Sequence, residues 1–339
     1  MQAVRTSRYS RCTVAAVLIL VLSVGGEVAA QTDGRGALTR QDFDALFARV
    51  DNAGRWGVDD ERGTLNLITD EIRRAAATEV RTGWNVSLAR ELVPGPVEGA
   101  IEPASLEFLM LSDSVLGPSD GSVMWTVDRL TILYHGFAYT HVDAPSHLSY
   151  LGRVYNAPAA HSETLEPQRS RVGSMRDGIV TRGVLVDLPR LRVAPFVEAN
   201  TAVTVADLAA WEAQTGLRVR TGDVVLLRGG RWTAEAAAAG VVATAALHPT
   251  VAEWLHERGA AAIGVEGSAD PDASLVPGIT SPFHVLALVG MGMPILENLD
   301  LDALAAEAAA RSRWSFLFVA APLDLRGATG SPVNPLAVF

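Results

Sequence analysis

The order of apolar segments most strongly constrains the fold of this 339-residue chain. The first half is strand-rich, and in the second half β-branched apolar runs alternate with segments whose apolar residues recur at helical spacing. We expect strands at 105–111, 122–134, 182–188, 223–228, 261–266 and 314–320. We expect helices at 41–50, 70–81, 205–215, 250–258 and 302–311. This order predicts an α/β protein with a mixed β-sheet core and packed helices.

The first thirty residues have the pattern of a secretory signal peptide. Arg5, Arg8 and Arg11 precede an apolar run at 13–24, and small residues lead to Ala30. The run is shorter than the ~20 residues that span a bilayer. We therefore expect removal of 1–30 and an exported, periplasmic or secreted protein, with an uncleaved membrane anchor as the alternative. The remainder is predicted as an N-terminal arm and helix (31–54) followed by a single domain (55–339).

Composition narrows the possible chemistry. The chain has 28 arginines, no lysine and one cysteine, Cys12, inside the predicted signal peptide. These absences exclude lysine Schiff-base chemistry, intrachain disulfides and thiolate zinc clusters. A net charge of −10 argues against nucleic-acid binding. After signal cleavage we expect no membrane association either, because no other segment is apolar for long enough.

A histidine cluster is the main candidate site. His135, His141, Asp143 and His147 lie within thirteen residues. In an extended segment His141 and Asp143 share a face, and Pro145 can turn the chain so that His147 returns towards them. Imidazole and carboxylate ligands without thiolate favour a divalent ion such as zinc or manganese, and the number of ions, one or two, stays open. Ordinary surface or core histidines are the alternative.

The cluster resembles the signature His-x-Gly-Thr-His-x-Asp-x-Pro-x-His of the cyclase family of metal-dependent hydrolases, which includes bacterial kynurenine formamidase and isatin hydrolase. Two positions depart from it, because Phe137 replaces the first histidine and Tyr139 the glycine. The resemblance implies a swivelling β/β/α fold for the single domain. The matching residues are Thr140, His141, Asp143, Pro145 and His147.

The resemblance also implies roles for individual residues. His141 and Asp143 would be metal ligands, with His284 and Glu297 as later ligands, and His147 would be the general acid/base. Glu297 lies in an apolar context, where an unpaired carboxylate is costly; helix capping is its alternative role. His135 either replaces the ligand missing at Phe137 or is structural, and the sequence leaves this open.

Substrate contacts are predicted less firmly. Phe137 and Tyr139 depart from the motif, and Trp56 lies in a segment that resembles the family near the substrate entrance. Trp232 and Arg231 could contact substrate, although a stacked surface pair is the favoured interpretation. Glu266 follows a predicted strand, and we expect a solvated loop carboxylate rather than a pocket residue.

The predicted function is metal-dependent hydrolysis of a small carbonyl substrate. Metal-activated water would cleave a C–N bond other than a peptide bond, or a C–O bond, with His147 transferring the proton. Arylformamidase-like cleavage of an N-formyl aryl amide, a lactam or a lactone fits this chemistry. The resemblance also implies a homo-oligomer. The alternative is a periplasmic small-molecule binding protein or a non-catalytic family member, which the substitutions at Phe137 and Tyr139 motivate.

Overall fold

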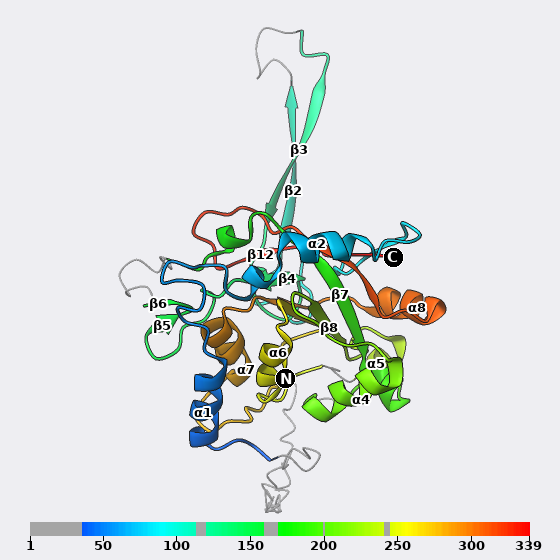
Figure 1. Ribbon diagram of the computed structural model, residues 1–339. Coiled ribbons are helices and arrows are strands. Elements are labelled where there is room, and N and C mark those ends of the chain that lie inside the picture. The colour runs from blue at the N-terminus through cyan, green and yellow to red at the C-terminus, as the bar shows by residue number, and fades with distance from the viewer. Residues whose placement is uncertain (1–35, 113–119, 159–168, 199–200, 241–244) are drawn as a thin grey trace, which may run out of the picture. The chain divides into compact units, whose positions relative to one another are not determined.

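The computed structural model describes residues 36–112, 120–158, 169–198, 201–240 and 245–339, and its central feature is a nine-stranded mixed sheet (Figure 1). Its spatial order is β1 (Asn85–Ser87), β13 (Leu336–Val338), β11 (Ser315–Ala320), β7 (Ile179–Asp187), β8 (Val224–Arg228), β9 (Ala262–Val265), β10 (Ile295–Glu297), β4 (His141–Asp143) and β12 (Gly330–Pro332). The predicted mixed α/β fold is confirmed.

Parallel strands form the centre of this sheet, and antiparallel strands form its two sides. β7, β8, β9 and β10 pair in parallel, and each connection between them contains helix. Parallel neighbours require such crossovers, which cover the sheet and leave its central strands buried on both faces. β4 joins β10 antiparallel, and β12 then joins β4, so the histidine segment lies near one edge of the sheet.

The predicted helices form, with local caps that explain their ends. Thr39 and Thr204 make capping boxes, and Gly216 and Gly259 end their helices in the left-handed conformation. The helix expected to reach residue 81 ends at Ala77 instead, followed by the cap residue Thr78. The helices are α1 (Arg40–Val50), α2 (Asp70–Ala77), α3 (Leu188–Arg192), α4 (Val205–Thr215), α5 (Ala234–Ala239), α6 (Val251–Arg258), α7 (Pro282–His284) and α8 (Asp302–Arg311).

Two sets of helices pack on the sheet, and a third set packs together. α2 contacts β7 and β11, whereas α3 and α4 pack on each other and against β7 and β8. α1 packs with α6 and with η4 (Val285–Met291), a π-helical turn that continues α7. The described residues also contain two short 3₁₀ turns, η1 (Gly63–Leu67) and η3 (Val172–Met175).

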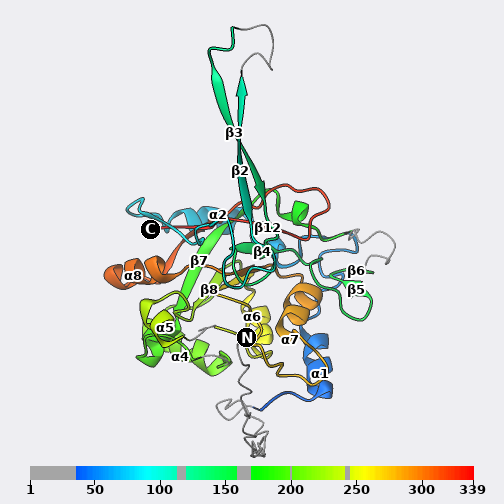
Figure 2. The same cartoon turned by 180° about the vertical axis from the view of Figure 1, so that it is seen from behind.

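Two small sheets stand apart from the large one. One pairs β5 (Arg153–Val154) with β6 (Ala157–Pro158). The other is a hairpin of β2 (Ser105–Ser112) and β3 (Met124–Thr131), which projects away from the large sheet in both views (Figures 1 and 2). Both predicted hairpin strands therefore form, although β3 ends three residues earlier than expected.

The predicted signal peptide, residues 1–30, lies outside the described residues and stays a prediction, as does the division into an arm and a domain. In the ranges described above, no helix is long and apolar enough to cross a bilayer.

Candidate metal centre

Strand β4 brings the motif residues together with the distant residue Glu297. In the sheet register His141 lies opposite Glu297 of β10, and Asp143 lies opposite Gly330 of β12. His141 and Asp143 project from the same face, as the period of two predicts. Ligand atoms of His141, Asp143 and Glu297 all lie within 4.8 Å of one another, and all three residues are buried. Glu297 is a strand residue, so its predicted alternative as a helix cap is wrong.

The His141 ring is oriented for ligation by its own backbone. Its Nδ1 lies 2.8 Å from the carbonyl oxygen of Tyr139, which accepts a hydrogen bond only if Nδ1 carries the proton. In the neutral ring, the form that can bind a metal, the lone pair is then on Nε2, which lies 3.4 Å from Asp143 Oδ1. The proton is therefore on the nitrogen that faces away from the centre.

His284 is oriented by Asp270, a carboxylate outside the set of site residues that the sequence predicts. Its Nδ1 lies 2.6 Å from Asp270 Oδ2, and its Nε2 lies 3.2 Å from Glu297 Oε1 and 3.9 Å from Asp143 Oδ2. A carboxylate–histidine pair of this kind fixes the tautomer and strengthens the imidazole as a ligand. The backbone N–H of Ala269 in turn donates to Glu297 Oε1 at 2.7 Å. The 269–270 turn thus supports both late ligands, and only its tertiary position reveals this.

His135 and His147 form the more exposed side of the centre. Their rings stack with centroids 4.0 Å apart. His135 Nδ1 lies 2.9 Å from Asp143 Oδ1, and His135, Asp143 and His147 form a second group of potential ligands. His135 therefore lies where it can replace the ligand missing at Phe137. Asp143 is common to both groups, so one or two ions fit the side chains present.

The centre passes a direct test of fit to a cation. Asp143 is buried, and its Oδ1 has no hydrogen-bond partner in the described part of the chain, although imidazole nitrogens of His135 and His141 lie near it. A buried carboxylate oxygen without a hydrogen bond is costly unless a cation compensates it. Nitrogen and carboxylate donors without sulfur match a divalent ion such as zinc or manganese.

The pKa values show the same excess of negative charge. Burial lowers the pKa of His141, but Asp143 and Glu297 raise it to a net value of about 9. Burial also lowers the pKa of His284, and Glu297 and Asp270 raise it well above its ordinary value. Without a metal, protons on imidazole compensate the buried carboxylates. A divalent cation can replace these protons.

Gly330 allows the close approach of β12 to this cluster. A Cβ atom at this position would lie 2.5 Å from the carbonyl oxygen of Val142 and 2.8 Å from Cε1 of His135. A side chain at Gly330 would therefore displace His135 or the backbone of β4.

The residues predicted to contact substrate differ in their exposure and in their contacts. Phe137 is 50% exposed and free to meet a ligand, whereas Tyr139 is buried and its hydroxyl accepts a hydrogen bond from the Ala104 N–H at 3.0 Å. Tyr139 thus has a structural role. Trp232 lies under two guanidinium groups, at 3.6 Å from Arg90 and 4.6 Å from Arg231, so the predicted stacked pair is confirmed.

Trp56 belongs to a segment that is connected by hydrogen bonds to residues next to His147. The Glu61 carboxylate accepts a hydrogen bond from the Ser170 N–H at 2.9 Å, and the Ser170 carbonyl accepts from Ser146, next to His147. Trp56 itself stacks with Arg55 at 4.6 Å. A position of this segment near the substrate entrance and contact of Trp56 with substrate both stay predictions.

The prediction that Glu266 is a solvated loop carboxylate is wrong. It is fully buried rather than solvated, because its carboxylate accepts hydrogen bonds from the backbone N–H groups of Gly229, Gly230, Arg231 and Leu301. Burial raises its pKa to about 7, although Arg228 acts in the opposite direction. Glu266 links the loop after β8 to the segment after β10. The local sequence has a carboxylate at the end of a strand followed by turn residues, and this pattern does not indicate these hydrogen-bond partners.

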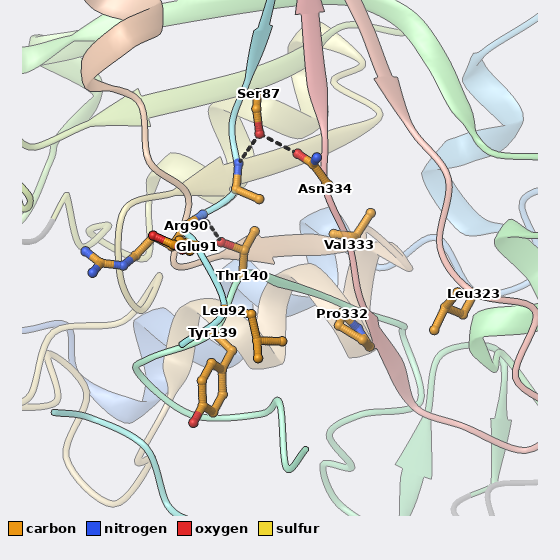
Figure 3. Close-up of a pocket in the computed structure, with 11 residues that line it drawn as sticks. Ser87, Arg90, Glu91, Leu92, Tyr139, Thr140, Leu323, Pro332, Val333 and Asn334 are labelled. Atoms are coloured by element: carbon orange, nitrogen blue, oxygen red, sulfur yellow. Dashed lines mark hydrogen bonds between the residues drawn. The ribbon is translucent and has the colours of Figure 1, made fainter. Parts of the chain in front are cut away.

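A pocket of about 490 Å³ adjoins the ligand strand (Figure 3). Its lining includes Tyr139 and Thr140, the two residues before His141. The Thr140 hydroxyl accepts a hydrogen bond from the Arg90 N–H at 2.9 Å. A second hollow of about 300 Å³ shares Arg90 and Tyr139 and extends to Trp232. Neither hollow includes a residue of the candidate centre in its lining, so both lie beside the segment that precedes His141 rather than at the centre itself.

Residues 117–121 carry a Gly-x-Ser-x-Gly pattern, the sequence signature of a nucleophile elbow. Its residues 117–119 lie outside the described residues.

The fold and the donor set thus define a mixed α/β protein with a candidate divalent-metal centre. A family described as "Putative cyclase" matches residues 118–271. A solved structure described as a novel cyclase is 27% identical, with a TM-score of 0.73, and the match covers 86% of this chain and 99% of that one. No curated protein is significantly similar to this chain.

Two isatin hydrolase structures share the fold at lower identity. Isatin hydrolase A from Labrenzia aggregata, bound to benzyl benzoate, is 23% identical with a TM-score of 0.52, covering 77% of this chain and 94% of its own. An isatin hydrolase bound to the product analogue thioisatinate is 19% identical with a TM-score of 0.50, covering 78% and 94%. The resemblance to the cyclase family and the expected fold are confirmed.

Proposed function

We propose that this chain is a metal-dependent hydrolase that cleaves a C–N or C–O bond of a small carbonyl substrate. The observation that carries the proposal is the buried convergence of His141, Asp143 and Glu297, with ligand atoms within 4.8 Å of one another. The Asp143 oxygen without a hydrogen bond supports it, as does a partly exposed His147 beside the same carboxylate. Structural histidines alone would not require this arrangement.

His141, Asp143 and Glu297 would hold the ion, with His284 oriented towards the same carboxylates. When bound, a zinc or manganese ion would supply Lewis-acid polarisation of the substrate carbonyl and activation of water. His135 would extend the ligand set or hold a second ion with Asp143. With a single ion at the buried group, His147 stays available for proton transfer.

His147 has the properties of a general acid/base. Burial lowers its pKa, nearby histidines lower it further, and Asp143 opposes them. The ring is therefore neutral near pH 7 and can accept a proton at an imidazole nitrogen. In the described residues its nitrogens make no hydrogen bond, while stacking on His135 holds the ring in place. It could then deliver the proton to the leaving nitrogen or oxygen.

The test pairs metal analysis with a hydrolysis screen. The purified protein should contain stoichiometric divalent metal and hydrolyse a member of a panel of formanilides, lactams and lactones. The panel includes isatin because two structural neighbours are named isatin hydrolases. His147→Ala should keep the metal and lose turnover. His256→Ala is the control, since this histidine hydrogen-bonds Asn52 away from the centre.

Two outcomes would contradict the proposal. Metal that survives both His141→Ala and Asp143→Ala would refute the ligand assignment. Unchanged turnover in His147→Ala would refute the proton-transfer role. The alternative of a small-molecule binding protein rests on the departures at Phe137 and Tyr139, but His135 lies close enough to Asp143 to compensate for the first of them.

We also propose that residues 1–30 direct export and are then removed. Expression with the natural N-terminus should yield an exported protein that begins at Gln31. N-terminal sequencing measures this, and a membrane-bound product that retains residues 1–30 would contradict it.

A further inference from the structure

Two arginine side chains, Arg90 and Arg231, meet at one tryptophan ring and are here called the arginine pair. Their guanidinium carbons lie 3.6 Å and 4.6 Å from the centre of the Trp232 ring. In the described part of the chain neither guanidinium pairs with a carboxylate. The Arg231 side chain reaches the Phe137 carbonyl oxygen only at 3.5 Å, beyond the usual hydrogen-bond range, and its buried Nε has no partner. The arginine pair is therefore short of acceptors.

The ring of Phe339 shows that sharing an aromatic ring does not by itself leave arginines unpaired. Arg311 and Arg313 also approach this ring, at 5.3 Å and 5.8 Å from its centre. Their guanidinium groups pair with carboxylates, Arg311 with Glu307 at 3.1 Å and Arg313 with Glu79 at 2.6 Å. The chain thus neutralises these two arginines with its own side chains, which it does not do for the arginine pair.

The arginine pair concentrates positive charge at one place on a protein whose net charge is −10. Burial lowers the pKa of Arg231, and the charge of Arg90 lowers it further, while more distant carboxylates oppose both effects. A neighbouring like charge acts in this direction because the two cations repel each other. A bound anion would remove the repulsion, and the planar guanidinium group matches the geometry of a carboxylate.

Both members of the arginine pair line the hollow of about 300 Å³, which also has an apolar wall. Val93, Val97 and Ala237 contribute to this wall beside the tryptophan ring. Glu91 and Glu98 line the hollow as well, but both are exposed, so solvent and salt screen their charge. The volume lies at the lower end of the range for small-molecule sites. Apolar side chains next to two cations fit a small organic carboxylate better than an inorganic anion.

The protein holds these groups in place without a ligand. The indole N–H of the tryptophan donates to the Leu299 carbonyl oxygen at 2.7 Å, and the Arg231 backbone N–H donates to the buried Glu266 carboxylate at 3.2 Å. Arg231 follows the carboxyl end of β8, and α/β proteins bind ligands at this side of their parallel strands. In Figure 3 the Arg90 side chain extends away from Asn334 of the larger pocket, in agreement with its place in the smaller hollow.

We propose that the arginine pair and Trp232 form a binding site for a small organic carboxylate with an apolar body. The carboxylate oxygens would accept hydrogen bonds from the guanidinium groups, and the apolar body would pack against the valine side chains. The lining of the hollow contains no residue of the candidate metal centre, so this site is separate from it. The inference does not depend on the proposed hydrolysis.

Calorimetric titration of the purified protein with benzoate tests the proposal. Benzyl alcohol has the same ring without the charge, and inorganic phosphate has charge without the ring, so benzoate should bind at least ~10-fold more tightly than either. Arg90→Gln and Arg231→Gln should each weaken benzoate binding by about 10- to 100-fold, the loss expected for one hydrogen bond to a charged group. Arg190→Gln is the matched control, because Arg190 stacks on Trp314 at 5.1 Å and lies outside the lining of the hollow.

Two measurements separate this site from the metal centre and from misfolding of the variants. Phenanthroline, a chelator without carboxylates, should leave the benzoate affinity unchanged, because the arginine pair needs no ion. Benzoate should also change the tryptophan fluorescence of the unaltered protein, and Trp232→Phe should remove this change.

Several results would overturn the proposal. In the unaltered protein these are absence of benzoate binding, an equal affinity for benzyl alcohol or phosphate, and loss of binding with the chelator. Among the variants, full benzoate affinity in both arginine substitutions would show that the arginine pair does not hold the carboxylate. A fluorescence change that persists in Trp232→Phe would place the ligand elsewhere.

Discussion

The metal centre and the β2–β3 hairpin depart in opposite ways from the usual distribution of residues. The centre buries carboxylates and imidazoles, whereas the hairpin exposes nine large apolar side chains. Each is costly for an isolated chain, because buried charge needs compensation and exposed apolar surface needs cover. The comparison teaches that the two regions differ in what the chain itself supplies. The centre has side chains that fit a cation, whereas the described residues do not cover the apolar side chains of the hairpin.

The largest expected effect comes from removing the charge shared by both ligand groups. Asp143→Asn keeps the shape of the side chain but supplies a weaker ligand. We expect metal content and hydrolysis to fall by more than ~100-fold, beyond the 10–100-fold loss typical of outer-shell changes. Elemental analysis and turnover measure this, with Asp44→Asn on exposed α1 as the control. Retained metal would show that Asp143 is not a ligand.

Glu266 is a buried carboxylate that accepts its hydrogen bonds from backbone N–H groups of the protein, in contrast to the carboxylates of the metal centre. Its pH dependence therefore tests whether protein groups alone can stabilise a buried carboxylate. Its folded-state pKa of about 7 exceeds the ordinary 4.5, so the unfolded chain loses its proton first as pH rises. The free energy of unfolding should therefore fall between about pH 4.5 and 7, by at most roughly 3 kcal/mol. Glu266→Gln should remove this decline. Denaturant titrations at several pH values measure it, and equal slopes for both proteins would contradict it.

Asp270→Asn sharpens the role assigned to His284. The substitution weakens the hydrogen bond that orients the imidazole, so metal affinity should fall by about 10–100-fold while the fold persists. Competition with a chelator measures the affinity. Asp324→Asn, an exposed carboxylate, is the control. An unchanged affinity would place His284 outside the ligand set.

The smallest expected effect on the free energy of unfolding comes from truncating an exposed side chain of the β2–β3 hairpin. Phe108→Ala should change the free energy of unfolding by no more than about 0.5 kcal/mol, because the side chain is exposed. Phe43→Ala, the same change at a buried position, should cost about 3–5 kcal/mol. Thermal unfolding at low concentration compares them. A large loss from Phe108→Ala would mean that the hairpin packs within its own chain.

Local features were predictable because they depend on neighbours in sequence. Periodicity located the strands, and threonine and glycine caps marked helix ends such as Thr204 and Gly216. The motif also placed His141 and Asp143 on one face. The Asp270–His284 pair was not predictable, because its partners meet only after two segments pack. Glu266 was predicted as solvated because no local pattern indicates four N–H donors from other loops.

The hairpin shows another limit. Its apolar runs indicate strands, and apolar residues at every position indicate burial on both faces. The tertiary structure leaves these residues exposed, so the burial expected from their pattern does not occur within the described residues.

The sequence by itself determined the kinds of elements, the donor types available for a metal, and the absence of lysine and of any cysteine other than Cys12. Only the tertiary structure decided that β4 lies between β10 and β12, which brings Glu297 and Gly330 beside the motif. The reason is physical. Strand periodicity and helix capping are local, whereas strand order depends on which apolar faces can be buried together.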